Sequence, residues 1–218
     1  MNSEKSPSDE NLDSKKIERP APVDREVVWD KTKTIMSKTD LFGTIEYAND
    51  IFVEVSGYED YELMAHPHNI IRHPDMPKVI FKVMWDNIKQ GNQFHGIVKN
   101  MSKSGRYYWV ITNFEYDREE DGTIVNYIGR RKAVPQDVIT NHIQPLYNKL
   151  LQIEKVSGLD ASEKYLKGFL QEAGVSYVDF ITNLMLESEL ANQKKDEPTA
   201  DKPAEKEHKK GFFERFFS

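Results

Sequence analysis

Residues Asn69–Trp85 read NIIRHPDMPKVIFKVMW, a charged turn followed by an amphipathic helix. The turn is Arg72–Pro77, and its closing proline suits the first turn of a helix, where a missing N–H group is harmless. Apolar residues then recur at helical spacing. The sequence therefore predicts a helix over Met76–Gln90, with Asp75 as its N-cap and Gly91 at its end.

Strand patterns lie on both sides of this helix. Before it, the segments around Ile35 and Thr44–Ala48 are typical of two short strands, and Asn49 is expected to cap a short helix that ends at Gly57. After it come three strand-like segments with hairpin glycines between them, namely Phe94–Met101, Tyr107–Tyr116 and Thr123–Ala133. This order predicts an α+β domain, a five-stranded antiparallel sheet with short helices over one face.

Composition limits the class of protein. The chain has 218 residues, 30% of them charged, and a net charge of −6, so polar tails are expected around a smaller core. It has no cysteine, which excludes disulfides, cysteine-ligated zinc and iron–sulfur clusters. No long basic stripe is present, which argues against nucleic acid as a partner. With neither a long apolar segment nor a secretory signal, the sequence predicts a cytoplasmic protein.

The same patterns divide the chain into five parts. A polar tail, expected to be disordered, spans residues 1–24, and the α+β domain spans residues 32–134. Residues 138–190 contain three amphipathic helices whose apolar stripes predict a partner surface or a homodimer seam, unless the helices dock back on the sheet. A flexible charged linker is expected over 191–210, before the aromatic end at 211–218, GFFERFFS.

Several residues around the helix are candidates for binding a ligand. Arg72 and His73 offer cationic or donor groups at a helix start, where free N–H groups also attract anions such as a pyrophosphate. Trp85 offers an aromatic wall, and the strand amide of Asn100 needs hydrogen-bond partners, as does the amide of Asn49. Taken singly, the turn residues are explained equally well by a helix entry. For Trp85, Asn100 and Asn49, a structural role in a core, turn or cap is the better explanation of each residue alone.

The motifs resemble the flavin-binding PAS domain of the Aer-type energy-taxis receptors. They resemble in particular the relatives in which this domain is a separate soluble subunit of a bipartite system (Aer/CetB-like). The resemblance covers residues 33–135 and rests on Ala48–Asp50, Val55–Tyr58, Pro67–Asn69, Arg72–Pro77, Trp85, Gly96–Asn100 and Tyr108–Val110. It implies a PAS fold with noncovalently bound FAD, held by Arg72, His73, Asp75, Trp85, Asn100, Asn49 and Phe81. His95 stands where an aromatic residue is expected, so the redox potential does not carry over from the relatives.

The resemblance implies a bacterial redox sensor for aerotaxis rather than an enzyme, signalling to a membrane-bound chemoreceptor subunit. Three alternatives stay open at this point: a cofactor-free PAS adaptor or dimerisation module, a flavin-dependent reductase, and a haem-binding PAS sensor. For haem, the candidate ligands are His66, His68, His73 and His95. The missing cysteine excludes the flavin–cysteinyl adduct of light-oxygen-voltage photoreceptors.

The aromatic end of the chain has no core of its own to enter. Exposure of four phenylalanines is unfavourable by about 25 cal/mol per Å² of apolar surface. Three interpretations compete: insertion at an anionic membrane surface, a tether that recruits adaptation enzymes, and folding back on the domain. The residues concerned are Phe212, Phe213, Phe216 and Phe217.

Overall fold

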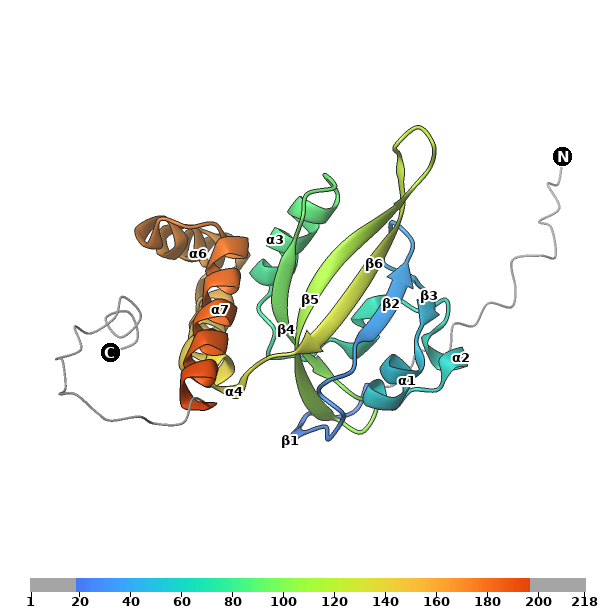
Figure 1. The fold of residues 1–218 in the computed structure, drawn as a ribbon. Helices are drawn as coiled ribbons and strands as arrows, with labels where there is room; N and C mark the ends of the chain where they lie inside the picture. Colours follow the sequence, from blue (N-terminus) through green and yellow to red (C-terminus); the bar gives the residue numbers. More distant parts are fainter. Residues whose placement is uncertain (1–18, 197–218) are drawn as a thin grey trace, which may run out of the picture.

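The computed structural model describes residues 19–196, with side chains up to residue 193. Most of the predicted tail at 1–24, most of the linker at 191–210 and the whole aromatic end at 211–218 lie outside these residues. The elements, drawn in Figure 1, are β1 (Val23–Glu26), β2 (Ile35–Thr39), β3 (Ile45–Ala48), α1 (Asp50–Ser56), α2 (Asp60–Leu63), η1 (His68–Ile71), α3 (Lys78–Ile88), β4 (His95–Met101), β5 (Arg106–Arg118), β6 (Ile124–Ala133), α4 (Gln136–Val138), η2 (Ile139–Ile143), α5 (Gln144–Ser157), α6 (Leu159–Ala173) and α7 (Tyr177–Asp196).

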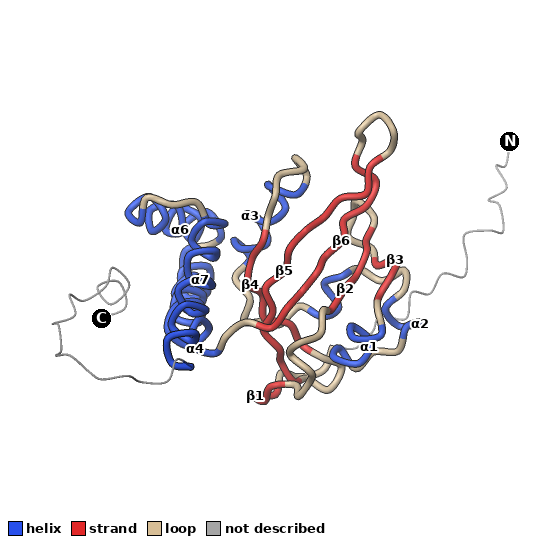
Figure 2. The backbone as a smooth tube through the Cα atoms, viewed as in Figure 1, coloured by secondary structure: helices blue, strands red, loops and turns tan. Residues whose placement is uncertain are grey.

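Five antiparallel strands form the sheet in the order β4-β5-β6-β2-β3, which confirms the predicted α+β fold (Figure 2). A sixth strand, β1, was not predicted. It runs parallel to the start of β5, and the N–H group of Val27 donates to the carbonyl of Tyr107 at 2.8 Å. Its sequence, VDRE, is largely exposed and lacks the apolar alternation that identifies a strand. β1 therefore begins inside the segment that the sequence assigned to a disordered tail.

The helix start differs from the prediction as well. α3 begins at Lys78, with Pro77 in the N-cap position, and the Asp75 side chain is exposed and caps no helix. The turn before α3 is held against the sheet instead, because the backbone of Arg72 forms an isolated antiparallel β-bridge with Asn100 of β4. The other caps agree with the sequence: Asn49 caps α1, which ends at Gly57 in the left-handed conformation.

The C-terminal helices form a layer beside α3 and β4 (Figure 1). Their apolar residues are buried in one cluster with residues of α3 and β4, such as Val79 and Ile97. The buried helix residues are Val138, Ile139, Ile143, Leu146, Tyr147, Leu150, Leu166, Phe169, Tyr177, Phe180, Ile181 and Leu184. These apolar residues therefore pack within the chain, as in the docked arrangement that the sequence left open, and a partner or dimer surface on these helices stays a prediction. α7 also continues to Asp196, into the segment expected to be a linker.

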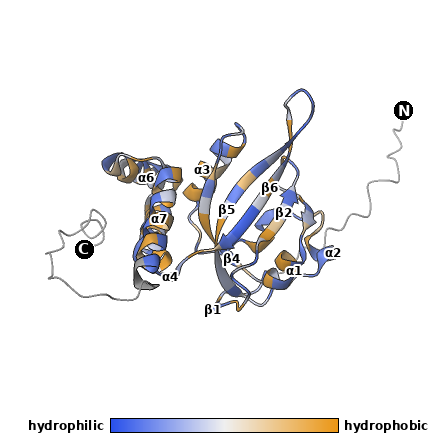
Figure 3. Cartoon of the chain, viewed as in Figure 1, coloured by the Kyte–Doolittle hydropathy of each residue, from blue (hydrophilic) through white to orange (hydrophobic). Residues whose placement is uncertain are grey.

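Polar contacts fix this layer to the sheet. The Tyr147 hydroxyl on α5 donates to the carbonyl of Ile97 at 2.6 Å and accepts from the Tyr177 hydroxyl on α7 at 2.7 Å. Burial raises the pKa of Tyr177 to about 12, so both hydroxyls keep their protons at neutral pH. Polar and apolar residues alternate along these helices (Figure 3), and no helix among the described residues is long and apolar enough to cross a membrane.

Candidate functional site

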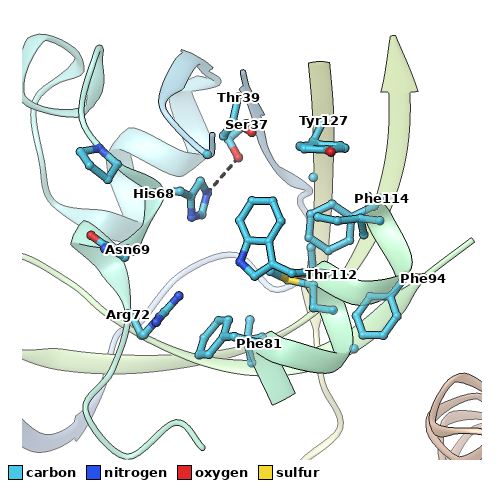
Figure 4. Close-up of a pocket in the computed structure, with 18 of the residues that line it drawn as sticks. Ser37, Thr39, His68, Asn69, Arg72, Phe81, Phe94, Thr112, Phe114 and Tyr127 are labelled. Atoms are coloured by element: carbon cyan, nitrogen blue, oxygen red, sulfur yellow. Dashed lines mark hydrogen bonds between the residues drawn. The ribbon is translucent and has the colours of Figure 1, made fainter. Parts of the chain in front are cut away.

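A cavity of about 520 Å³ lies between α3 and the face of the sheet that carries Asn100, Thr112 and Arg131 (Figure 4). Its volume falls within the range of about 300–1,000 Å³ that is typical of small-molecule sites. The larger apolar walls are Leu41, Phe42, Ile80, Phe81, Met84, Trp85, Ile88, Phe94, Val98, Phe114 and Tyr127. The polar lining is Ser37, Thr39, His68, Asn69, Arg72, Lys89, Asn100, Thr112 and Arg131.

Four of the seven residues proposed from the sequence meet in this cavity: Arg72, Phe81, Trp85 and Asn100. The Arg72 guanidinium lies over the Phe81 ring, with Cζ 3.6 Å from the ring centroid, a cation–π contact. The Trp85 ring stands edge-on to Tyr127, with 5.9 Å between the centroids. The turn before α3, α3 itself and the strands β4 and β6 therefore all contribute side chains to the lining of one cavity.

Two buried polar atoms of residues that line the cavity have no hydrogen-bond partner in the described part of the chain. They are Nδ2 of Asn100, a residue that is 5% exposed, and Nε of Arg72. A buried donor without an acceptor costs about 1–3 kcal/mol. A ligand that brings acceptor atoms to these two donors would remove that cost.

The other three proposed residues do not line the cavity. Asn49 is fully engaged in the fold, because its Oδ1 accepts from the N–H groups of Met36 and Phe52 while its Nδ2 donates to a carbonyl of the chain. His73 is buried against Tyr107 and accepts the N–H of Asp75 at 3.0 Å. Burial, with Lys99 nearby, lowers the pKa of His73 to about 4, so this ring is neutral and is no cation for a ligand.

The start of α3 is closed to a ligand by the chain itself. The N–H groups of Lys78 and Val79 both donate to the carboxylate of Glu154 on α5, at 2.9 Å each. An acidic side chain at this position also interacts favourably with the helix dipole. The predicted anion site at this helix start is therefore occupied by Glu154, which sequence reasoning could not find because it lies 76 residues away from Lys78.

A second polar group in the cavity was missed from the sequence. The Arg131 guanidinium on β6 donates from Nη2 to His68 Nε2 at 2.9 Å and from Nη1 to Ser37 Oγ at 2.9 Å. Ser37 Oγ also lies 3.0 Å from His68 Nε2 (Figure 4). Because Arg131 can only donate, His68 Nε2 accepts, and the neutral ring carries its proton on Nδ1. Burial, reinforced by Arg131, lowers the pKa of His68 well below its ordinary value.

The histidines do not favour haem. Of His66, His68, His73 and His95, only His68 lines the cavity, and its Nε2 already accepts a hydrogen bond from Arg131. His95 lies on the opposite face of the sheet, where its ring bonds Thr182 of α7 at 2.8 Å. An iron ligand needs a free ring nitrogen directed at the metal. None of these four rings offers one to the cavity.

The charge in the cavity is positive. Its lining contains Arg72, Lys89 and Arg131, and it has no aspartate or glutamate from the described residues. Neither Arg72 nor Arg131 forms an ion pair with any carboxylate that the structure describes. Buried cations without a counter-charge are unfavourable. The site therefore suits an aromatic ligand that carries or develops negative charge.

Comparisons with known proteins support the same fold. Residues 45–131 match the family model described as PAS fold. The aerotaxis receptor of Escherichia coli (strain K12) is 45% identical over 118 residues, which are 54% of this chain and 23% of the receptor. The bacterioopsin transcriptional activator of Halobacterium salinarum is 26% identical over 103 residues, 47% of this chain and 15% of the activator.

The solved structures that resemble the chain are more distant in sequence. One, described as "Flavin Analogue Sheds Light on Light-Oxygen-Voltage Domain Mechanism", is 22% identical with a TM-score of 0.47. The aligned region covers 54% of this chain and 90% of the chain in that structure. The chain spans less than a quarter of the length of either curated relative. On the family match and the strand order, this chain contains a PAS domain, and about half of its length is similar to an aerotaxis receptor.

Proposed function

We propose that the cavity binds FAD noncovalently and that the chain is the redox-sensing component of an energy-taxis system. The observation that carries the proposal is the unpartnered Nδ2 of Asn100, buried in a cavity with aromatic walls and no acidic lining among the described residues. A flavin ring offers acceptor atoms along its edge and flat faces for Trp85 and Phe81. When bound, FAD supplies reversible electron transfer, which the protein side chains lack.

The polar residues of the cavity are suited to two different parts of the cofactor, the flavin ring and the pyrophosphate. Asn100 is 5% exposed and is suited to the edge of the ring. Arg72 is half-buried and Lys89 is exposed, so these two cations are suited to the hydrated pyrophosphate. The start of α3 plays no part, because Glu154 takes its free N–H groups.

The signal would leave the cavity through α3 and β4. α3 lines the cavity with Phe81 and is held from outside by α6, where Lys82 bonds Glu163 at 3.1 Å. Phe94 lines the cavity and also stacks on Tyr177 of α7, with 5.9 Å between centroids and 9° between planes. A change of charge on the ring would thus bias the packing of the C-terminal helices.

The output would be a membrane-bound chemoreceptor-type subunit, which is proposed on the similarity to an aerotaxis receptor. The sensor would then work at the cytoplasmic face of the membrane through that partner, as a monomer or a homodimer. α7 offers apolar surface for the contact, since its Leu186 and Leu190 are about half exposed. This assembly requires no catalytic residue.

The test is titration of the purified chain with FAD, followed by absorbance and by quenching of flavin fluorescence. The Asn100→Ala variant should bind FAD roughly 5-fold to 150-fold more weakly, which corresponds to about 1–3 kcal/mol for one buried hydrogen bond. Asn113→Ala is the matched control, because Asn113 is exposed on β5 outside this cavity. A colourless protein that takes up no FAD would favour the cofactor-free adaptor, and steady NAD(P)H turnover would favour the reductase.

A further inference from the structure

Arg131 is a buried cation whose hydrogen bonds leave its charge unneutralised. The residue is 4% exposed, and its guanidinium donates to three acceptors, Ser37 Oγ, the Gly129 carbonyl and His68 Nε2, at 2.9, 3.1 and 2.9 Å. All three acceptors are neutral groups. The guanidinium is thus oriented by the fold, while the counter-charge that a buried cation needs is missing from the described chain.

The other titratable groups that line the cavity do not supply this counter-charge. Arg72 and Lys89 are cations, from the turn after η1 and from α3, while His68 and Tyr127 are neutral at physiological pH. Burial lowers the pKa of Arg131 to about 10, which leaves the guanidinium protonated at neutral pH. The deep wall of the cavity therefore carries a fixed positive charge.

The depth of Arg131 separates it from the two other cations. Lys89 is exposed and Arg72 is half-buried, whereas Arg131 projects from the inner face of β6, enclosed by Ser37 and His68. A pyrophosphate keeps much of its hydration and is better accommodated by the more accessible cations. A flat aromatic ring that enters the cavity meets Arg131 in its wall. The group that Arg131 faces is thus expected to be the ring.

On the FAD binding proposed above, we propose that Arg131 is the counter-charge of the reduced flavin. The oxidised ring is neutral, so it has no charge to pair with the buried cation. Two-electron reduction with uptake of one proton gives a ring with one negative charge, and Arg131 would hold it in that form so that no second proton is taken up. The electrons come from an external low-potential donor. The cavity would thereby bind the reduced ring more tightly than the oxidised ring and raise the midpoint potential.

The direct test is potentiometric reduction of the FAD-loaded chain, with dithionite as reductant, at several pH values down to mildly acidic pH. If reduction by two electrons takes up one proton, the midpoint potential falls with rising pH. The slope is then half of the slope expected when two protons are taken up. The half slope in the unmodified protein is the expected result, and the full slope would overturn the proposal. This measurement does not depend on whether any variant folds.

Three variants then assign the effect to Arg131. Arg131→Gln should lose at least tenfold in its preference for reduced over oxidised flavin, which lowers the midpoint of a two-electron couple by about 30 mV. It should also restore two-proton uptake in mildly acidic solution. Arg131→Lys keeps the charge and should stay near the unmodified protein. Arg130→Gln is the matched control, since Arg130 is exposed and pairs with Glu115 at 2.8 Å.

The outcomes separate this proposal from the one it rests on. A chain that binds no FAD at all would overturn flavin binding and this role together. A chain that binds FAD, but whose Arg131→Gln variant keeps the same midpoint and proton uptake, would leave flavin binding intact and refute the role of Arg131. Equal weakening of both flavin states by that variant would likewise show Arg131 to be a structural residue.

Discussion

Removal of the Glu154 carboxylate should loosen α3, the helix that carries Phe81 and Trp85 into the cavity. Glu154 accepts from two N–H groups at 2.9 Å, and the second of them belongs to Val79, which is fully buried. Loss of a helix cap costs about 0.5–2 kcal/mol, and a charged acceptor is at the upper end of the scale. We expect Glu154→Ala to lower the free energy of unfolding by about 2 kcal/mol.

Two further variants sharpen this prediction. Glu154→Gln keeps one acceptor oxygen without the charge, so it should lose about half as much stability, on the order of 1 kcal/mol. Glu172→Ala is the control, because Glu172 is exposed at the end of α6. In thermal unfolding, Glu154→Ala should lower the Tm by roughly 4–8 °C for a chain of this size. An unchanged Tm, with Glu172→Ala as the reference, would mean that α3 does not depend on the C-terminal helices.

The remaining predictions concern acid and the tyrosine pair. Because the pKa of His73 is about 4 in the fold and near 6.5 in the unfolded chain, the unfolded chain binds more protons between these values. The free energy of unfolding should therefore fall as pH drops from about 6.5 to 4, by on the order of 3 kcal/mol for His73. His73→Gln should remove that part of the slope in urea titrations. Tyr147→Phe leaves the Ile97 carbonyl without its donor and should cost about 1–3 kcal/mol in the same assay, whereas Tyr165→Phe should cost far less; equal losses would contradict the role of the hydroxyl.

The fold followed from local patterns, and its exceptions have identifiable causes. The alternation in β4 to β6 and the cap at Asn49 were readable because each depends on neighbouring residues. β1 gave no such signal, since VDRE pairs through its backbone with only the first residues of β5. For the C-terminal helices, the sequence left docking on the sheet open beside a partner seam, because an apolar stripe indicates burial without saying against which surface.

Four of the seven proposed site residues line one cavity, while their role in binding stays a prediction. Trp85, Phe81, Arg72 and Asn100 were recognised by their motifs, and the structure brings all four to one cavity. Arg131 was missed because it stands beside an exposed arginine in the run Gly-Arg-Arg-Lys. A signal was present in the alternation of β6, since Arg131 shares its face with the buried Tyr127. Arg131 lies four residues after Tyr127, and residues an even number of positions apart in a strand share a face of the sheet, so this spacing predicts that Arg131 faces the cavity.

The central claim is that the cavity holds a redox-active flavin. Its most direct test is the visible absorbance spectrum of the freshly purified chain, with added FAD where needed, recorded before and after dithionite. We expect the two-band spectrum of an oxidised flavin, near one flavin per chain, that bleaches on reduction and returns in air. A spectrum that stays featureless after FAD is added would contradict the account, and a Soret band would replace flavin with haem.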